Sequence, residues 1–246
     1  FYNCAALTGI TIPESVTNIE EWAFAGCGSL SGFMVADGNS HYANDESGVL
    51  YNKEKSELIR CPSTHSGTYA IPKSVTSVGS STFENCTALT GITIPESVAS
   101  IGHSAFKGCA ALTDIVLPPS VTSIGRRAFA NTAFYMNNAN WEHGALYLGQ
   151  NLIEVRTDIP GTYRIKAGTQ NIADSAFENC RKITEILMPK SVASIGENAF
   201  KDCAALSNIY IPKGVAKIQS GTFTGCSALT SITIPVSYTH LTLPTK

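Results

Sequence analysis

Hydrophobic positions recur along the chain with a fixed step of 23 residues. In the stretch Cys86–Ile101, the apolar residues Leu89, Ile92 and Ile94 alternate inward and the run ends at Pro95. The same proline position recurs at Pro13, Pro72, Pro95, Pro118, Pro189, Pro212 and Pro235. A step of this length is typical of a solenoid, in which each repeat packs only against its neighbours. We therefore expect a line of stacked layers instead of one globular core.

Each 23-residue repeat divides into a strand, a return segment and a closing turn. Alternating β-branched residues before Pro95 predict a short strand, and the proline ends its hydrogen-bonding ladder because it has no N–H. Val98 and Ile101 point inward from the return segment, and Phe106, in Ala-Phe-x-x-Cys, closes the layer on one short helical turn. The equivalent residues are Phe1, Phe24, Phe83, Phe106, Phe129, Phe177, Phe200 and Phe223. Stacked aromatic rings are therefore predicted to run through the array, and truncation of one to Ala would cost about 3–5 kcal/mol.

The residue before the repeated cysteine is always small or amide-like. It is Gly26, Asn85, Gly108, Asn179, Asp202 or Gly225. Gly, Asn and Asp tolerate a positive φ angle better than other residues. We predict a turn at this position, which also explains Asn85-Cys86-Thr87 more simply than glycosylation does.

The step breaks at two inserts, near residues 37–67 and 136–161. Each contains two apolar segments around a polar turn, which predicts a β-hairpin: Gly48–Tyr51 with Glu57–Arg60, and Gly144–Tyr147 with Asn151–Glu154. A Gly-Thr-Tyr strand then rejoins the solenoid, and the polar stretches Asp37–Ser47 and Asn137–His143 are expected to form loops. The sequence thus predicts one solenoid over residues 1–235 without a linker or second domain, followed by a non-repeat tail, 236–246.

Seven of the eight cysteines occupy one position, three residues after the repeated Phe. Neighbours in such a column lie about 5 Å apart with parallel side chains, whereas a disulfide needs converging Cβ atoms about 3.5–4.5 Å apart. We favour buried, reduced thiols that pack as small hydrophobic groups over a disulfide framework. Cys61 is outside the column, and no Cys/His spacing typical of a zinc site is present.

Charge and hydropathy limit the classes of partner. The net charge is −2 and the isoelectric point is about 6.2. These values argue against binding of nucleic acid or anionic lipid through a broad positively charged surface. No apolar run approaches the roughly 18 residues of a membrane helix. Because the chain opens in mid-repeat at Phe1, we expect it to be a fragment of a longer protein.

The unit Ile-Pro-x-Ser-Val-x-x-Ile-Gly-x-x-Ala-Phe-x-x-Cys-x-x-Leu-x-x-Ile resembles the BspA-like, or Treponema pallidum-type, leucine-rich repeat over nearly the whole chain except the tail. The resemblance implies a curved leucine-rich-repeat solenoid with a parallel β-sheet on its concave face, short turns or helical turns on its convex side, and hairpin inserts between repeats. It also implies a cell-surface or secreted protein, since several such proteins are adhesins for host or matrix proteins. This sequence departs from the pattern at Lys166, which replaces Pro, and at Thr132, which replaces Cys.

The sequence contains few candidates for catalytic or metal-binding residues. The five His share no column, and the sequence contains no phosphate-binding Gly-rich loop, G-x-S-x-G or H-E-x-x-H motif. Trp22 and Trp141 are expected to pack against the core instead of binding a ligand. We predict a non-enzymatic protein without a cofactor or metal.

The outward strand positions of the expected concave face are the most informative surface. They are small and uniform in the N-terminal half and chemically mixed from Asp114 onward. The candidate binding residues are Asp114, Val116, Arg164, Glu185, Leu187, Asn208 and Tyr210. Apolar and aromatic residues ringed by polar ones are typical of a protein-binding patch, although residues of these types also simply suit a strand.

The leading hypothesis is a protein-binding module of an adhesin-like protein, with a host or matrix protein as partner. A structural spacer that displays another domain, and a carbohydrate- or cell-wall-directed region attached to an enzyme, are the alternatives that the sequence leaves open.

Overall fold

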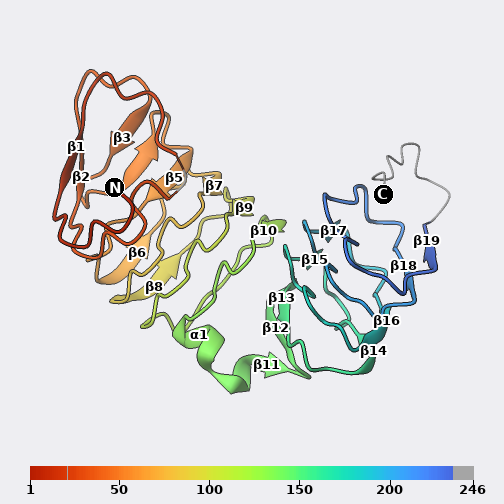
Figure 1. Ribbon diagram of the computed structural model, residues 1–246. Coiled ribbons are helices and arrows are strands. Elements are labelled where there is room, and N and C mark those ends of the chain that lie inside the picture. Colours follow the sequence, from red (N-terminus) through yellow and green to blue (C-terminus); the bar gives the residue numbers. More distant parts are fainter. Residues whose placement is uncertain (21, 235–246) are drawn as a thin grey trace. The chain divides into compact units, whose positions relative to one another are not determined.

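The structure is a computed structural model that describes residues 1–20 and 22–234, so the predicted tail lies outside the described residues. The chain forms two compact units, Phe1–Trp141 and Glu142–Lys246 (unit 1 and unit 2), and their boundary falls inside the second predicted insert. Figure 1 shows stacked turns and mostly short strands in both units.

Unit 1 contains two kinds of ladder. Strands that lead into the proline position pair in parallel: β1 (Ile10–Ile12) with β2 (Phe33–Val35), and β6 (Gly67–Ala70) with β8 (Leu89–Thr93). The return segments form a second sheet, in the order β10 (Ser123–Ile124), β9 (Ser100–Ile101), β7 (Ser77–Val78), β5 (Glu57–Arg60), β4 (Leu50–Asn52) and β3 (Tyr42–Asn44). After the last repeat come the one-turn helix α1 (Ala133–Met136) and the 3-10 turn η1 (Asn138–Asn140).

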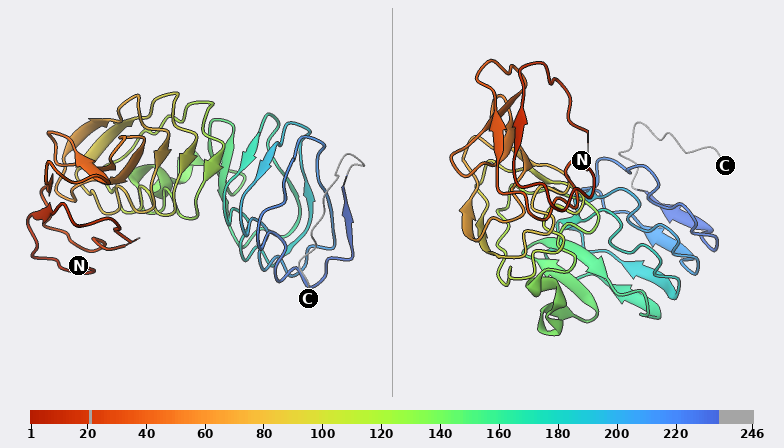
Figure 2. Two further views of the ribbon diagram at one scale, coloured as in Figure 1. Left: turned by 90° about the horizontal axis from the view of Figure 1, so that it is seen from above. Right: turned by 60° about the vertical axis from the view of Figure 1, so that its left-hand side comes forward.

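Unit 2 repeats this plan. Its front sheet, the one that leads into the proline position, is β14 (Gly161–Arg164), β16 (Ile183–Leu187), β18 (Asn208–Tyr210) and β19 (Ser231–Thr233), all parallel. The second sheet has the order β11 (Trp141–Glu142), β12 (Ala145–Leu148), β13 (Asn151–Val155), β15 (Asn171–Ile172) and β17 (Ser194–Ile195). Figure 2 shows the successive turns within each unit from two further sides.

Proline ends each front strand as the sequence predicts. The Pro95 carbonyl oxygen accepts a hydrogen bond from the Val98 N–H at 3.0 Å, and Pro189 and Val192 make the same turn at 3.2 Å. The chain then reverses into the return segment, where the Ile101 side chain is buried. The 23-residue step therefore corresponds to one complete turn of a mainly parallel solenoid.

The repeated phenylalanines form the predicted ring stacks. The rings of Phe83 and Phe106 are stacked with centroids 5.0 Å apart, and Phe106 and Phe129 are stacked at 5.5 Å. In unit 2, the Phe200 and Phe223 rings are stacked at 5.5 Å, whereas Phe177 and Phe200 lie 5.2 Å apart with their planes tilted by 37°. The Ala-Phe-x-x-Cys segments that present these rings are turns, without an assigned helix in the described residues.

The repeated cysteines are reduced, and most are buried. Their thiols also donate hydrogen bonds that the sequence did not predict: Cys109 to the Phe83 carbonyl oxygen at 3.0 Å, and Cys203 to that of Phe177 at 3.1 Å. Thr132, which replaces Cys in the column, donates from Oγ1 to the Phe129 carbonyl oxygen at 2.9 Å. The column therefore favours a small residue that is also a hydrogen-bond donor.

The turn position before the cysteine has positive φ at all six predicted residues, from 58° at Asp202 to 77° at Gly26. Gly at this position follows Asn or Asp on the preceding turn for a packing reason, because a Cβ atom on Gly108 would collide with Oδ1 of Asn85, and one on Gly225 with Oδ1 of Asp202. A second positive-φ column includes Ser81, Ser104 and Ser175. The sequence did not predict this second column, because serine has no marked preference for that conformation.

Both predicted hairpins are present. Strands β4 and β5 are antiparallel, as are β12 and β13, and β5 and β13 also pair in parallel with the next return strand. The hairpins thus belong to the second sheets.

The prediction that Asp37–Ser47 is a loop was wrong at Tyr42–Asn44, which form β3 and pair with β4. One polar side chain of this stretch is not solvated: Asn39 is fully buried, and its amide donates to the carbonyl oxygens of Pro13 and Val16. The second expected loop, Asn137–His143, likewise contains η1 and β11.

Candidate functional site

The front sheet of unit 2 presents one side to solvent and buries the other. Tyr163, Ile186 and Ile209 point into the core and are buried. Between them, the outward residues are Arg164 on β14, Glu185 and Leu187 on β16, and Asn208 and Tyr210 on β18. This alternation follows from the two-residue period of a strand.

The strand register places these five residues side by side. Arg164 is opposite Leu187, and Glu185 is opposite Asn208. Leu187 and Tyr210 each follow the paired residues Ile186 and Ile209, and Tyr210 is 48% exposed. We call these five outward residues the front face of unit 2.

One hydrogen bond positions the Glu185 side chain on this face. Oγ1 of Thr162 donates to Oε2 of Glu185 at 3.1 Å across β14 and β16. Glu185 is half-buried, whereas Arg164 and Asn208 are exposed. The face therefore carries an apolar and aromatic pair between a guanidinium group and polar side chains.

Asp114 and Val116 belong to unit 1, so the front face of unit 2 does not include them. Both are exposed, Val116 at 80%, and their segment is not assigned as a strand. Oγ1 of the neighbouring Thr113 donates to Oδ2 of Asp114 at 3.1 Å.

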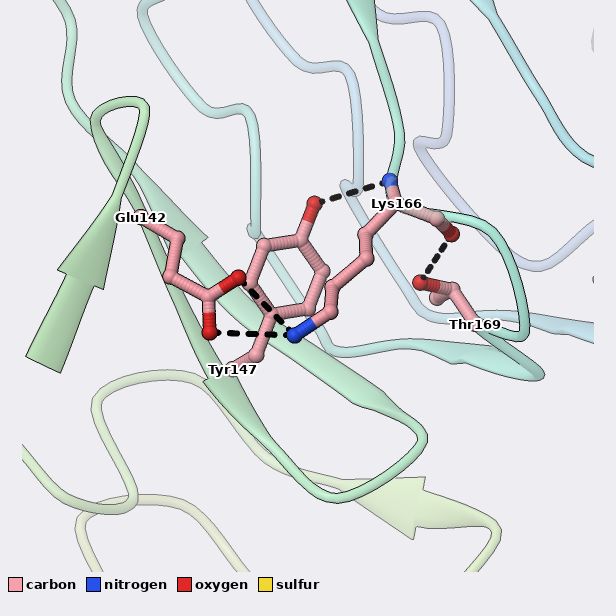
Figure 3. Close-up of polar contacts among 4 residues, drawn as sticks. All are labelled: Glu142, Tyr147, Lys166 and Thr169. Carbon is pink, nitrogen blue, oxygen red and sulfur yellow. Dashed lines mark hydrogen bonds and ion pairs between the residues drawn. The ribbon is translucent and has the colours of Figure 1, made fainter.

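A polar cluster at the end of β14 explains why Lys166 replaces proline (Figure 3). The Lys166 N–H, which a proline would lack, donates to the Tyr147 hydroxyl oxygen at 3.2 Å. Its ammonium group forms an ion pair with Glu142, 2.8 Å from Oε2, and lies 5.6 Å from the centroid of the Tyr147 ring. The carbonyl oxygen of Lys166 accepts from Oγ1 of Thr169 at 2.8 Å. The hairpin β12–β13 is thereby tied to the edge of the front sheet.

A related cluster fixes the first hairpin. The hydroxyl groups of Tyr51 and Tyr69 hydrogen-bond to each other and to Oδ2 of Asp45, at 3.1 and 2.8 Å. Burial raises the pKa of both phenols, and Asp45 raises each pKa as well. Their mutual hydrogen bond raises the pKa of Tyr69 but lowers that of Tyr51. Both stay protonated at neutral pH, which suits a structural contact better than acid–base chemistry.

The buried thiols of Cys109 and Cys180 are likewise poor nucleophiles. Burial raises the pKa of Cys180 to about 12, and the nearby carboxylates Glu154 and Asp158 raise it further. Burial also raises the pKa of Cys109. The reactive species is the thiolate, so these residues are suited to packing.

The described residues contain no group of three or more His, Cys, Asp or Glu side chains arranged to hold a metal ion. No helix in residues 1–20 and 22–234 is both long and apolar enough to cross a bilayer. Trp22, expected to pack in the core, is 60% exposed, so that prediction was wrong.

The stacked 23-residue turns, with two ladders and a ring stack, define a repeat protein of the solenoid class, and the exposed front face is its candidate functional surface. The chain belongs to the family of the BspA type leucine rich repeat region, which matches in six copies at residues 1–68, 58–154 and 161–243.

Solved structures of the same kind extend beyond this chain. A leucine-rich repeat protein from Eubacterium ventriosum is 27% identical with a TM-score of 0.50, and the match covers 96% of this chain and 62% of the other. The pneumococcal vaccine antigen PcpA is 21% identical with a TM-score of 0.52, with coverage of 93% and 56%. The chain thus spans less than two thirds of either protein. No curated protein matches the sequence.

Proposed function

We propose that this chain is a non-enzymatic repeat module that binds a protein partner through the front face of unit 2. The observation that carries the proposal is the placement of half-buried Leu187 and exposed Tyr210 on the outward side of the neighbouring strands β16 and β18. Packing in the core does not require a large side chain at either position. Apolar groups ringed by polar ones mark interaction surfaces, and Tyr and Arg often carry binding energy.

In the proposed contact, Arg164, Leu187 and Tyr210 form the centre, and Glu185 and Asn208 surround them. On unit 1, Asp114 and Val116 are proposed as partner-binding residues in their own right, separate from the front face of unit 2. Their exposure supports this role.

We further propose that the module belongs to a cell-surface or secreted, adhesin-like protein whose partner is a host or matrix protein. Support for this location comes from the family resemblance alone. A panel of purified extracellular matrix proteins is therefore the first set of partners to test.

The first prediction concerns the double variant Leu187→Ala/Tyr210→Ala. It should retain the melting temperature of the wild type, because both side chains point away from the core. Its affinity for a protein that the wild type captures from the panel should fall by at least about 2 kcal/mol. Surface plasmon resonance measures the affinity and circular dichroism the melting temperature.

The matched control is Thr11→Ala/Thr93→Ala, on exposed front-strand positions of unit 1, which should leave the affinity unchanged. Equal affinities of the wild type and the Leu187/Tyr210 variant would show that the partner binds outside the front face of unit 2. A chain that captures no protein would instead be a structural spacer.

A further inference from the structure

Two lysines lie in equivalent turns at the carboxyl edge of the front sheet of unit 2. Lys190 follows Pro189 and Lys213 follows Pro212, directly after β16 and β18. Both turns are closed in the same way, by Val192 donating to Pro189 at 3.2 Å and Val215 to Pro212 at 3.1 Å. Successive turns of the backbone are about 5 Å apart, so the two exposed lysines border the same edge of the front face.

Within residues 1–20 and 22–234, these charges are not neutralised by an ion pair. Elsewhere in unit 2, Lys166 pairs with Glu142, and Lys201 pairs with Glu178 at 3.4 Å. Across the described part of the chain, neither Lys190 nor Lys213 has an ion pair or a side-chain hydrogen bond, and nor does the guanidinium of Arg164. Three cations therefore lie beside Leu187 and Tyr210, against one carboxylate on this face, Glu185, which accepts a hydrogen bond from Thr162.

The positive edge is specific to unit 2. The same turn position in unit 1 carries Glu14, Lys73, Glu96 and Pro119. Unit 1 has seven Lys and Arg against eleven Asp and Glu, whereas unit 2 has ten against eight. The overall charge of −2 is therefore the sum of a negative unit 1 and a positive unit 2, and the unpaired cations of unit 2 lie beside half-buried Leu187 and exposed Tyr210.

We propose that the partner of this face is an acidic protein segment, whose carboxylates contact Lys190, Lys213 and Arg164 while an apolar side chain packs on Leu187 and Tyr210. This inference rests on the proposed function and adds the chemistry of the partner. Complementary charge at the rim of an interface speeds association and selects among partners. A nucleic acid or a sulfated glycan fits less well, because the cations are few and the centre of the face is apolar.

The test is selection from a phage-displayed library of random twelve-residue peptides, performed in parallel on three forms of the full chain. These are the wild type, Lys190→Glu/Lys213→Glu, and the control Lys73→Glu/Lys217→Glu. The control changes the net charge equally. Lys73 is the equivalent turn residue of unit 1, and Lys217 is an exposed residue of the return segment.

The wild type and the control should select peptides rich in Asp and Glu that also contain an aromatic or aliphatic residue. The Lys190→Glu/Lys213→Glu variant should bind such a synthetic peptide about 10-fold more weakly and select Lys- and Arg-rich peptides instead. Raising the ionic strength from about 0.05 to 0.5 M should weaken the wild-type interaction, because exposed charges are screened.

The outcomes separate the inference from the proposed function. Selected peptides that depend on Leu187 and Tyr210 but show no excess of acidic residues would overturn the acidic partner and leave the binding face standing. Peptides insensitive to both pairs of residues, or no selection at all, would overturn both. Binding of heparin or of a 20-base-pair DNA that is lost in Lys190→Glu/Lys213→Glu, without acidic peptide selection, would assign the edge to a polyanion.

Discussion

At the scale of single residues, the repeated cysteine is both a small apolar group and a donor. Cys109 packs in the core and its thiol hydrogen-bonds to the Phe83 carbonyl oxygen one turn earlier. The same carbonyl oxygen also accepts from the Cys86 N–H at 3.0 Å, so a valine would fill similar space and lose only the thiol hydrogen bond, at a cost of about 0.5–1.5 kcal/mol. Thr132, the residue that replaces Cys, is also a donor, but its hydroxyl group donates to Phe129 within its own turn.

Thiol labelling tests this role. In the native protein, Cys4 is exposed and should react rapidly with a maleimide, whereas Cys27, Cys86, Cys109, Cys180 and Cys203 are buried and should react only after denaturant is added. Mass spectrometry of peptides from a labelling time course gives each rate. Cys4→Ser is the control that removes the rapid phase, and rapid native labelling of the buried column would contradict the assignment.

The raised pKa values predict a loss of stability in alkali. Cys109 and Cys180 titrate near pH 8.5 in the unfolded chain but have a raised pKa in the folded protein, as do Tyr51 and Tyr69 relative to about 10. Above about pH 8.5 the unfolded state therefore loses protons that the folded state retains, so the free energy of unfolding falls as pH rises.

Urea denaturation at pH 7, 9 and 10.5 measures this change. The free energy of unfolding should decrease steadily across the series, and Tyr69→Phe should show a smaller decrease between pH 9 and 10.5. A flat profile would show that these groups titrate alike in both states.

At the scale of elements, the hairpins are fixed by tyrosine hydroxyl groups. Tyr147 on β12 accepts from the Lys166 N–H and hydrogen-bonds to Tyr163 on β14, whose pKa is raised by burial and by that bond. The nearby ion pair of Lys166 with Glu142 is half exposed, at 51% for each side chain. Exposed ion pairs contribute little, so the hydroxyl group should matter more than the ammonium group.

Tyr147→Phe and Lys166→Ala separate the two contributions. Tyr147→Phe should lower the free energy of unfolding by about 1 kcal/mol, because it leaves a backbone N–H and a buried phenol without a partner. Lys166→Ala keeps the backbone N–H and should change stability by less than about 0.5 kcal/mol. Urea denaturation measures the free energy of unfolding of both variants. A larger loss for Lys166→Ala than for Tyr147→Phe would show that the ion pair, and not the hydroxyl group, holds the hairpin.

At the scale of the whole molecule, each turn of the solenoid is stabilised mainly by contacts with the turns next to it. Strand β16 pairs with both β14 and β18, whereas β1 pairs only with β2, and β19 only with β18, among the described residues. All three residues of β19 are exposed. Repeat proteins gain stability mainly from contacts between neighbours, so strands with one neighbour should open more often.

Hydrogen–deuterium exchange tests this gradient. Amides of β1 and β19 should exchange faster than those of β16 and its neighbour β18. Uniform protection in all four strands would contradict nearest-neighbour stabilisation.

The sequence alone determined the features that repeat. The 23-residue step predicted the front strands, the proline turns, the phenylalanine stack and the positive φ at positions such as Asn85 and Asp202. The physical reason is that each position meets its own equivalent on the next turn, so local preference and packing specify the same structure. The alternation also predicted which residues of the front sheet point outward.

Only the tertiary structure decided the features that do not repeat. Strand β3 forms because Asn39 meets carbonyl groups of another turn, and Lys166 replaces proline because Tyr147 lies beside its N–H. Likewise, the sequence contains Lys190 and Lys213, but it does not reveal that carboxylates are paired elsewhere and leave both lysines uncompensated. Such contacts join residues without a periodic relation, and their energies depend on three-dimensional proximity, which the hydrophobic pattern does not encode.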